Sequence, residues 1–369
     1  MDYRFILSLM ALPLCAQTPP TRPAPVISPE AKVAHSMTFR LKAPAAKEVS
    51  VQLQGVKDAL PMVKADDGIW SATVNPIAAG VWEYSFRVDG VTMIDPGNPA
   101  IKPTREPRTS ILQLASTPPA IWDFQKVPHG TGHQLGYFSE ALNAPREIRV
   151  YTPPGYETSS GKFPLLVLQH GSGDNQNTWV EHGKAHWILD NLIATGKAKP
   201  MIIVMLDGHP PEHLNASGPE KRATAIEAFR RELLEDALPL VEKSYRVEDS
   251  SSQRAIAGLS MSGAQALSVG LGNLDRFAWV GSLSGSRASE TVVQAICADA
   301  SGTNAKLRLL WIGCGKEDFL LESNQEFTAK LKESGINHQW HLTAGDHSWP
   351  VWREYLAELL PLLFQPSVK

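Results

Sequence analysis

A serine that could act as a nucleophile lies in the pattern Gly258-Leu259-Ser260, between a short apolar run and a segment of small residues. A serine on a tight strand-to-helix turn presents its hydroxyl above the sheet edge and its backbone N–H near the start of the helix. Small residues are needed two positions to either side, because larger ones would collide across the turn. Gly258 meets this requirement, whereas Ser262 stands where a second glycine is usual. The pattern fits a nucleophile elbow, although Gly-x-Ser also occurs in ordinary loops.

A serine hydroxyl is a poor nucleophile at neutral pH, so it needs a base, and the base needs an acid to orient it. Glu317 and Asp318 follow the apolar run 307–312, and both qualify as that acid by residue type. His347 follows the next expected strand, at about 338–343. In α/β-hydrolases the order along the chain is serine, acid, histidine. Since loops at the carboxyl ends of parallel strands share one edge of the sheet, the three groups are expected to meet there.

The elements that would position these groups alternate between strand and helix. Continuous apolar runs at 163–169, 201–206, 277–282 and 307–312 are typical of strands buried on both faces, as in a parallel sheet. Helical segments are expected at 185–195, 223–243, 263–271, 323–334 and 352–363, with a kink at Pro239. The alternation predicts an α/β architecture with right-handed crossovers.

The first third of the chain has a different pattern. Residues 33–114 contain short alternating strands at about 36–41, 48–53, 69–74 and 82–88, separated by Asp-Gly turns and without a helical stretch. This predicts a β-sandwich over residues 31–116. Its aromatic residues alternate as core residues would, at Trp70, Trp82, Tyr84 and Phe86. We therefore expect a domain that docks on its neighbour and shapes its active site, with glycan binding as the alternative.

The N-terminus and the composition narrow the class of protein. Residues 1–17 have Arg4, an apolar run from Phe5 to Cys15 and small residues after it, which indicates a secretory signal peptide; a buried first element is the alternative. The run is too short to span a bilayer, so no membrane span is expected in the mature chain, which would be secreted or periplasmic.

Residues 18–30 are rich in proline and are predicted to form a linker. The net charge of -3 argues against a nucleic-acid partner. Outside the leader, Cys297 and Cys314 permit one disulfide without requiring it.

The chain resembles a known family in both domains. Residues 120–369 resemble carbohydrate esterase family 1, which includes feruloyl and acetylxylan esterases, and the enterochelin esterases, which also carry an N-terminal sandwich. Residues 31–116 resemble the early-set immunoglobulin-like modules. The resemblance rests on four stretches: Leu168-Gln169-His170-Gly171-Ser172-Gly173-Asp174, Ala257-Gly258-Leu259-Ser260-Met261, Gly315-Lys316-Glu317-Asp318 and Gly345-Asp346-His347-Ser348-Trp349-Pro350-Val351-Trp352-Arg353. It implies an α/β-hydrolase fold with Ser260 as nucleophile, Asp318 as acid and His347 as base.

A tetrahedral oxyanion needs preorganised hydrogen-bond donors. One is expected to be the backbone N–H of Met261, at the start of the elbow helix, and the resemblance implies the N–H of Ser172 as the other. The alternative for the glycines around Ser172 is an ordinary tight turn. His182 and His186 have helical i, i+4 spacing that could bind zinc, but no third ligand is apparent, and solvated histidines are the preferred interpretation. We expect neither a metal nor an organic cofactor.

The resulting hypothesis is a secreted serine esterase that removes feruloyl or acetyl groups from plant polysaccharides or oligosaccharides through an acyl-enzyme. The first alternative is an esterase of enterochelin-type siderophores or other small esters. The second is a non-catalytic glycan-binding protein, suggested by Ser262 and the sandwich. Trp179 and Trp349 are candidates for stacking on the sugar or on an aromatic acyl group, with core packing as the alternative. The acyl group, the sugar and the oligomeric state stay open.

Overall fold

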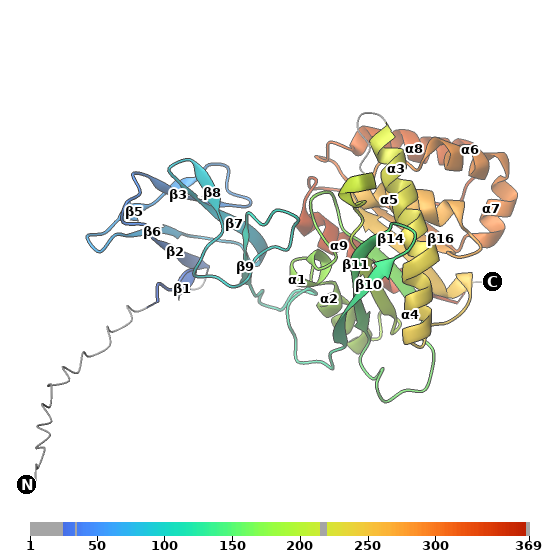
Figure 1. Ribbon diagram of the computed structural model, residues 1–369, viewed down its shortest axis with the longest axis horizontal. Helices are drawn as coiled ribbons and strands as arrows, with labels where there is room; N and C mark the ends of the chain where they lie inside the picture. The colour runs from blue at the N-terminus through green and yellow to red at the C-terminus, as the bar shows by residue number, and fades with distance from the viewer. Residues whose placement is uncertain (1–24, 34, 215–219, 367–369) are drawn as a thin grey trace, which may run out of the picture.

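The computed structural model describes residues 25–33, 35–214 and 220–366. The predicted signal peptide at 1–17 and most of the predicted linker at 18–30 lie outside the described residues. The described chain forms two domains that lie side by side along the long axis of the molecule, a smaller all-β domain and a larger α/β domain (Figure 1).

The N-terminal domain is a β-sandwich, as predicted. One sheet has the order β1 (Glu30–Val33), β2 (Ser36–Lys42), β6 (Ile69–Val74), β5 (Val63–Lys64). The other has the order β4 (Leu60–Pro61), β3 (Val49–Leu53), β7 (Gly80–Val88), β8 (Val91–Met93), and β9 (Ser110–Leu114) also pairs with β7. Alternate residues of these strands point inward and form the core, which includes Phe39, Trp70, Tyr84 and Phe86. The predicted core aromatics Trp70, Tyr84 and Phe86 are buried, so they offer no exposed surface on which a glycan could stack. The fourth predicted aromatic, Trp82, is only partly buried.

The sandwich begins earlier than the proline-rich stretch 18–30 suggests, and its last strand lies within a second such stretch. Ser28 is buried and donates a hydrogen bond to Asp95 at 2.6 Å, so residues 28–30 belong to the sandwich and not to a linker. The proline- and charge-rich segment 102–120 contains β9, whose five residues all pair with β7. Proline and charged residues flank this edge strand, so a prediction from composition does not identify it.

The larger domain is built on an eight-stranded sheet. Its order is β10 (Thr131–Ser139), β11 (Ala144–Thr152), β13 (Ile202–Leu206), β12 (Leu165–Gln169), β14 (Arg254–Leu259), β15 (Trp279–Leu283), β16 (Leu309–Gly315), β17 (Gln339–Thr343). Strands from β13 to β17 in this order pair in parallel. All residues of β12, β13, β15 and β16 are buried, as the four apolar runs predict. The antiparallel hairpin β10–β11 at one edge was not predicted as a pair, because β10 is largely exposed and lacks an apolar run.

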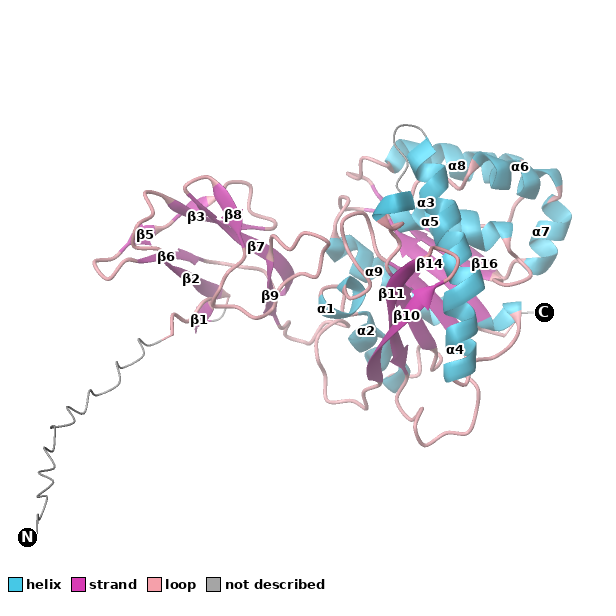
Figure 2. Cartoon of the chain, in the orientation of Figure 1, coloured by secondary structure: helices cyan, strands magenta, loops and turns pink. Residues whose placement is uncertain are grey.

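Helices cover both faces of this sheet (Figure 2). Side chains of α2 (Ala185–Ala194) and α9 (Trp349–Leu359) fill the core on one face. The core on the other face takes side chains from α3 (Lys221–Arg231), α4 (Leu238–Ser244), α5 (Met261–Gly272), α6 (Glu290–Ala298) and α8 (Leu321–Glu333). The short helices α1 (Thr178–Glu181) and α7 (Ala300–Lys306) complete the set in the described chain, and α6 and α7 were not predicted. This three-layer arrangement is an α/β-hydrolase fold.

The helix predicted at 223–243 changes its winding before Pro239. Residues Glu232–Ala237, between α3 and α4, form a π-helical turn in which the Leu238 N–H donates to the carbonyl of Leu233, five residues back. Pro239 has no N–H to offer the preceding turn, and the wider turn accommodates that loss within one continuous helical path.

Cys297 and Cys314 are both free thiols, so the disulfide that the sequence permits is not formed. Cys314 is buried in β16, where burial raises its pKa to about 12. No helix in the described part of the chain is long and apolar enough to cross a bilayer.

Candidate active site

Ser260 occupies the tight turn between β14 and α5 with φ = 51° and ψ = -117°, a backbone conformation that an L-residue rarely adopts. The turn brings the backbone of Ser262 against that of Gly258. A Cβ atom at position 258 would lie 2.4 Å from the Ser262 carbonyl oxygen, so only glycine fits there. The strained turn lifts the serine side chain away from the sheet, which is the geometry that the Gly-x-Ser pattern predicts.

The structure brings Ser260, His347 and Asp318 into one hydrogen-bonded row. The Ser260 Oγ lies 2.8 Å from the His347 Nε2, and the His347 Nδ1 lies 2.9 and 3.0 Å from the two carboxylate oxygens of Asp318. Asp318 follows β16 and His347 lies in the loop between β17 and α9, so the three side chains come from the carboxyl ends of β14, β16 and β17, at one edge of the sheet. The order along the chain and the position at one sheet edge agree with the sequence-based expectation.

Asp318 is buried and ionised. Burial alone would raise its pKa, but hydrogen bonds from His347 and from the Leu320 backbone N–H, at 2.8 Å, hold the pKa of Asp318 below its usual value. A carboxylate on the Nδ1 side fixes the imidazole tautomer with the proton on Nδ1. The Nε2 lone pair then faces the Ser260 hydroxyl and can accept its proton.

Glu317, the other acid that qualified by residue type, has a different position. One of its carboxylate oxygens accepts the Gly345 backbone N–H at 2.6 Å and so holds the loop that precedes His347. The structure therefore distinguishes the two neighbouring acids: Asp318 contacts the imidazole, and Glu317 contacts only the backbone of the histidine loop.

Ser262 replaces the usual glycine without entering the cavity. Its side chain is fully buried, and its Oγ donates to the Gln265 Oε1 at 2.7 Å. Gln265 in turn donates to the Gly208 carbonyl at 2.8 Å. The extra hydroxymethyl group thus forms a local hydrogen bond that ties the elbow helix to the loop after β13.

The two predicted oxyanion donors border the serine. Met261 is the first residue of α5, where backbone N–H groups have no acceptor within the helix. Ser172 lies in the loop after β12, on the wall of a cavity of about 390 Å³ that also contains Ser260 and His347. Ser172 and Met261 together line an adjoining cavity.

The two predicted stacking tryptophans lie deeper than expected. Trp349 is only 2% exposed and borders the Ser260 cavity with part of its ring. Trp179 is 1% exposed, donates from Nε1 to the Gln169 carbonyl at 2.9 Å and packs edge-on against Trp349. Because its ring is enclosed by core residues, Trp179 has no surface with which to stack on a substrate, and the expectation for that residue is wrong.

Four residues that the sequence did not single out also line the Ser260 cavity. Three come from the sandwich and the segment after it: Gln54, Glu83 and Lys102. The fourth, Phe319, is 76% exposed, and its ring centroid lies 4.4 Å from that of His347. Phe319 could have been noticed because it directly follows Asp318, whereas nothing local marks the sandwich residues, which reach the site only through domain docking.

The histidines outside the row are hydrogen-bonded or buried. His182 is fully buried with its Nε2 3.4 Å from the Glu83 Oε1 of the sandwich, which corrects the expectation that it is solvated. Within the described ranges, one group of three side chains has the spacing of metal ligands, namely His170, Asp207 and His209, whose donor atoms lie within 4.8 Å of one another. The lone pairs of both imidazoles in this group already accept backbone N–H bonds, from Gly208 at His170 and from Gly173 at His209. Hydrogen bonds therefore explain why these three side chains lie close together.

Comparison with known proteins identifies the family of the chain. Residues 139–363 match the family described as "Putative esterase". The chain is 30% identical over 335 residues to an endo-1,4-beta-xylanase/feruloyl esterase of Xylanibacter ruminicola, a match that covers 89% of this chain and 44% of that protein. The chain thus spans less than half the length of that relative.

Solved structures match one or both domains. A ferulic acid esterase that is 28% identical superposes with a TM-score of 0.56, covering 64% of this chain and 97% of its own. The enterobactin esterase of Shigella flexneri, 23% identical, superposes with a TM-score of 0.64 over 90% of this chain and 93% of its own, so its fold extends across both domains. The family match spans well over half of the chain and includes Ser260, Asp318 and His347. The chain therefore belongs to this family of carboxylic ester hydrolases.

Proposed function

We propose that the protein is a serine esterase in which Ser260 is the nucleophile, His347 the general base and Asp318 the residue that orients the imidazole. The observation that carries the proposal is the 2.8 Å contact between the Ser260 Oγ and the His347 Nε2 on a strained elbow, with a buried carboxylate on the far side of the ring. A hydroxyl, an imidazole and a carboxylate in this order are the parts that acyl transfer requires.

The reaction would proceed in two halves. His347 takes the Ser260 proton as the Oγ attacks the ester carbonyl carbon, and the imidazolium that forms is stabilised by Asp318. The carbonyl oxygen becomes an oxyanion that accepts hydrogen bonds from the N–H groups of Ser172 and Met261. His347 then returns the proton to the leaving alcohol, which leaves an acyl-Ser260 intermediate. Water attacks this intermediate with the same base, releases the acid and restores the serine.

The surroundings of Ser260 favour an ester that joins an apolar acyl group to a polar alcohol. On one side lies a cavity of about 470 Å³ lined mainly by apolar groups, among them Ile226, Met261, Ala264 and Phe319. The cavity that contains Ser172 combines charged and polar groups, among them Gln54, Glu83 and Lys102, with the side chains of Trp349 and Trp352. A feruloyl group in the first cavity and a sugar in the second would match both surfaces. We therefore propose acylated plant polysaccharides or their oligosaccharides as the substrate class, with acetyl esters as the smaller variant.

The site of action follows from the predicted signal peptide. A protein that acts on polysaccharide must meet it outside the cytoplasm, so a secreted or periplasmic location is consistent with this substrate. Cell fractionation with an antibody to the protein tests the location.

The experiment for the activity is release of ferulate and acetate from xylan fragments by the wild-type protein and by Ser260→Ala. We expect measurable release from the wild type and a loss of about 10⁴-fold or more in the variant, since the nucleophile is gone. A fluorophosphonate probe should label the wild type at Ser260 and leave the variant unlabelled. Equal activity of both proteins would remove Ser260 from its role, and absence of labelling with retained glycan binding would favour a non-catalytic binding protein.

A second substrate class is supported by the fold and by the charges near the site. The superposition with the enterobactin esterase extends over the sandwich. A cavity of about 610 Å³ beside Ser172 is lined by four cationic side chains against three carboxylates, namely Lys102, Arg105, Arg108 and Lys221 against Glu83, Glu106 and Asp174. Cationic side chains suit an anionic ester such as a ferric catecholate siderophore. Comparing kcat/KM for methyl ferulate, an acetylated xylo-oligosaccharide and ferric enterobactin distinguishes the two classes.

A further inference from the structure

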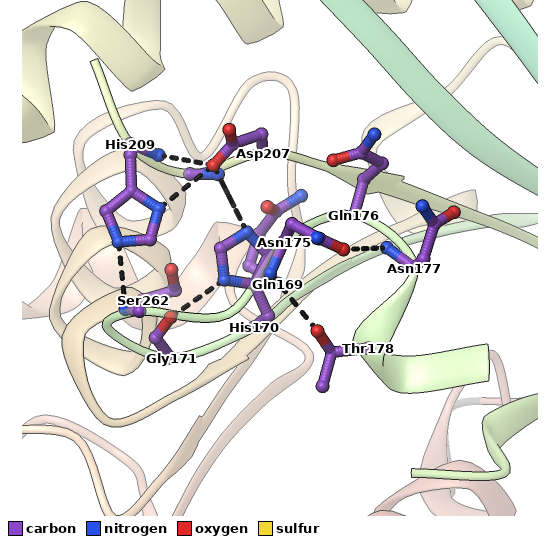
Figure 3. A network of polar contacts seen from close by, with 12 residues as sticks. Gln169, His170, Gly171, Asn175, Gln176, Asn177, Thr178, Asp207, His209 and Ser262 are labelled. Atoms are coloured by element: carbon purple, nitrogen blue, oxygen red, sulfur yellow. Dashed lines mark hydrogen bonds and ion pairs between the residues drawn. The ribbon is translucent and has the colours of Figure 1, made fainter. Parts of the chain in front are cut away.

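The loop that carries the proposed oxyanion donor Ser172 is held by two histidines that the reaction itself does not use. We infer that the group His170, Asp207 and His209, here named the loop clamp, positions the Ser172 backbone N–H for the oxyanion. The inference rests on the proposed function and adds positioning residues to it. Figure 3 shows the two imidazoles converging on Asp207 from the loop after β12 and the loop after β13.

The first contact orients the peptide group that contains the donor. The His170 Nδ1 donates to the Gly171 carbonyl oxygen at 2.8 Å. This carbonyl and the Ser172 N–H belong to the same peptide unit, which is planar, so the N–H must point away from the carbonyl. Fixing the carbonyl toward His170 therefore directs the Ser172 N–H to the opposite side of the loop.

The second contact fixes the next peptide group along the chain. The Gly173 N–H donates to the His209 Nε2 at 3.1 Å, and the Gly173 carbonyl accepts the Arg105 backbone N–H at 2.8 Å. Gly173 has φ = 82°, so glycine allows the chain to turn between these two anchors. Both peptide units that flank Ser172 are thus held, while its own N–H is left for a ligand.

Asp207 determines which nitrogen of the His209 ring is free to accept a hydrogen bond. It accepts the His209 Nδ1–H at 2.9 Å, which leaves the His209 Nε2 as an acceptor for Gly173. The Gly171 carbonyl sets the His170 tautomer in the same way, because it takes the Nδ1 proton and leaves the Nε2 to accept the Gly208 N–H at 3.1 Å. This Nε2 lies 3.5 Å from the Asp207 Oδ1. The two rings stack with centroids 5.3 Å apart, so each also restricts the other. Burial alone would raise the pKa of Asp207, but its contacts with the two histidines hold that pKa well below the usual range, and the carboxylate stays ionised.

The test compares variants of His209 that do and do not offer an acceptor to Gly173. His209→Phe keeps a flat ring but loses both nitrogens, whereas the amide oxygen of His209→Gln can reach the position of Nε2. We expect His209→Phe to lower kcat about 10- to 100-fold with little change in KM, because misplacing a donor costs part of the roughly 10²–10³ that one oxyanion donor contributes. His209→Gln should recover most of this loss. His213→Phe is the matched control, because its imidazole contacts the Leu142 carbonyl away from the cavity.

Affinity for a tetrahedral mimic separates positioning from general damage. A trifluoromethyl ketone analogue of the ester should bind His209→Phe more weakly by the same factor as kcat falls, while affinity for the product acid stays unchanged. Equal losses for both ligands, or full activity in His209→Phe, would overturn the inference. If His209→Phe fails to fold, a crystal structure of the wild type with the ketone decides, since the oxyanion must lie within hydrogen-bonding distance of the Ser172 N–H.

Activity of Ser260→Ala and of His209→Phe distinguishes failure of the proposed function from failure of the loop clamp. If Ser260→Ala is as active as the wild type, the proposed function fails, whatever the His209 variants do. If Ser260→Ala is inactive and His209→Phe is normal, only the loop clamp fails. Dialysis against EDTA should leave activity unchanged; a loss that zinc restores would show instead that the three side chains hold a metal.

Discussion

His182, which directly follows α1 of the hydrolase domain, places its Nε2 3.4 Å from the Oε1 of Glu83 in β7 of the sandwich. The same carboxylate pairs with Lys102 at 3.0 Å, and Lys102 pairs with Asp174 of the oxyanion loop at 3.3 Å. Glu83 and Lys102 also line the Ser260 cavity. The charges that join the two domains are therefore the ones that form the polar wall of the site.

This relationship gives a pH-dependent prediction for Glu83. Burial alone would raise its pKa, but His182 and Lys102 lower the pKa of Glu83 to about 2, against an ordinary value of 4.5. A carboxyl group with a depressed pKa stabilises the folded state above pH 4.5, and this stabilisation is lost as the pH falls toward 2. At pH 7 we expect Glu83→Gln to lower the free energy of unfolding by about 2–3 kcal/mol.

The measurement is denaturant unfolding of wild type and Glu83→Gln between pH 7 and the lowest pH at which both remain folded. The difference between the two proteins should shrink below pH 4.5. Glu326→Gln, an exposed change on α8, is the control and should show no such trend. A difference that does not vary with pH would refute the charge-pairing explanation.

The distinction between Glu317 and Asp318 predicts different effects for two conservative changes. Asp318→Asn should reduce kcat by about 10³–10⁴, because an amide no longer holds the imidazole in the productive tautomer. Glu317→Gln should reduce it less than 10-fold, because its oxygen can still accept the Gly345 N–H. Steady-state kinetics on 4-nitrophenyl acetate measure both, and equal losses would contradict the assignment.

The buried hydrogen bond of Ser262 predicts a change in stability more than in rate. Ser262→Gly removes the bond to Gln265 and adds a glycine to a helix, each of which costs about 1 kcal/mol. We expect a lower melting temperature and a kcat within a few-fold of wild type, since Ser262 is fully buried and does not contact the reacting groups. A large increase in kcat would show instead that Ser262 crowds the elbow.

The exposed ring of Phe319 predicts a preference for aromatic acyl groups. Phe319→Ala should lower kcat/KM for methyl ferulate about 3- to 10-fold relative to 4-nitrophenyl acetate, which corresponds to the 0.5–1.5 kcal/mol of an aromatic contact. Phe138→Ala, an exposed change on β10, is the control. An unchanged ratio of the two substrates would exclude Phe319 from the acyl cavity.

The sequence was most informative where the physics is local. Apolar runs predicted β12, β13, β15 and β16 because these strands are buried on both faces, and the small residue required at Gly258 marked the elbow. The edge hairpin escaped because β10 is mostly exposed, and β9 escaped because it is flanked by prolines. Trp179 looked like a binding residue since composition does not distinguish a core ring from an exposed one.

The site was predictable only as far as one domain determines it. Ser260, Asp318 and His347 lie at strand ends, so their order along the chain places them at one sheet edge. Glu83 and Lys102 reach this edge because the sandwich docks there. No hydrophobic period or residue spacing in the sequence predicts that contact. The loop clamp joins two loops through side chains, and the sequence showed its histidines only as isolated residues.

Arg353 is a buried side chain that forms hydrogen bonds to the backbone of both domains. This side chain of α9 is 2% exposed and donates to the Val81 carbonyl of β7 at 2.7 Å and to the His182 carbonyl at 3.1 Å. Helix α9, which follows the proposed base, is thus hydrogen-bonded to the backbone of the sandwich. Exchange of the sandwich for that of a distant relative would put the Val81 acceptor of this buried guanidinium at risk and leave only the His182 carbonyl, so we expect the two domains to be inherited as a single unit.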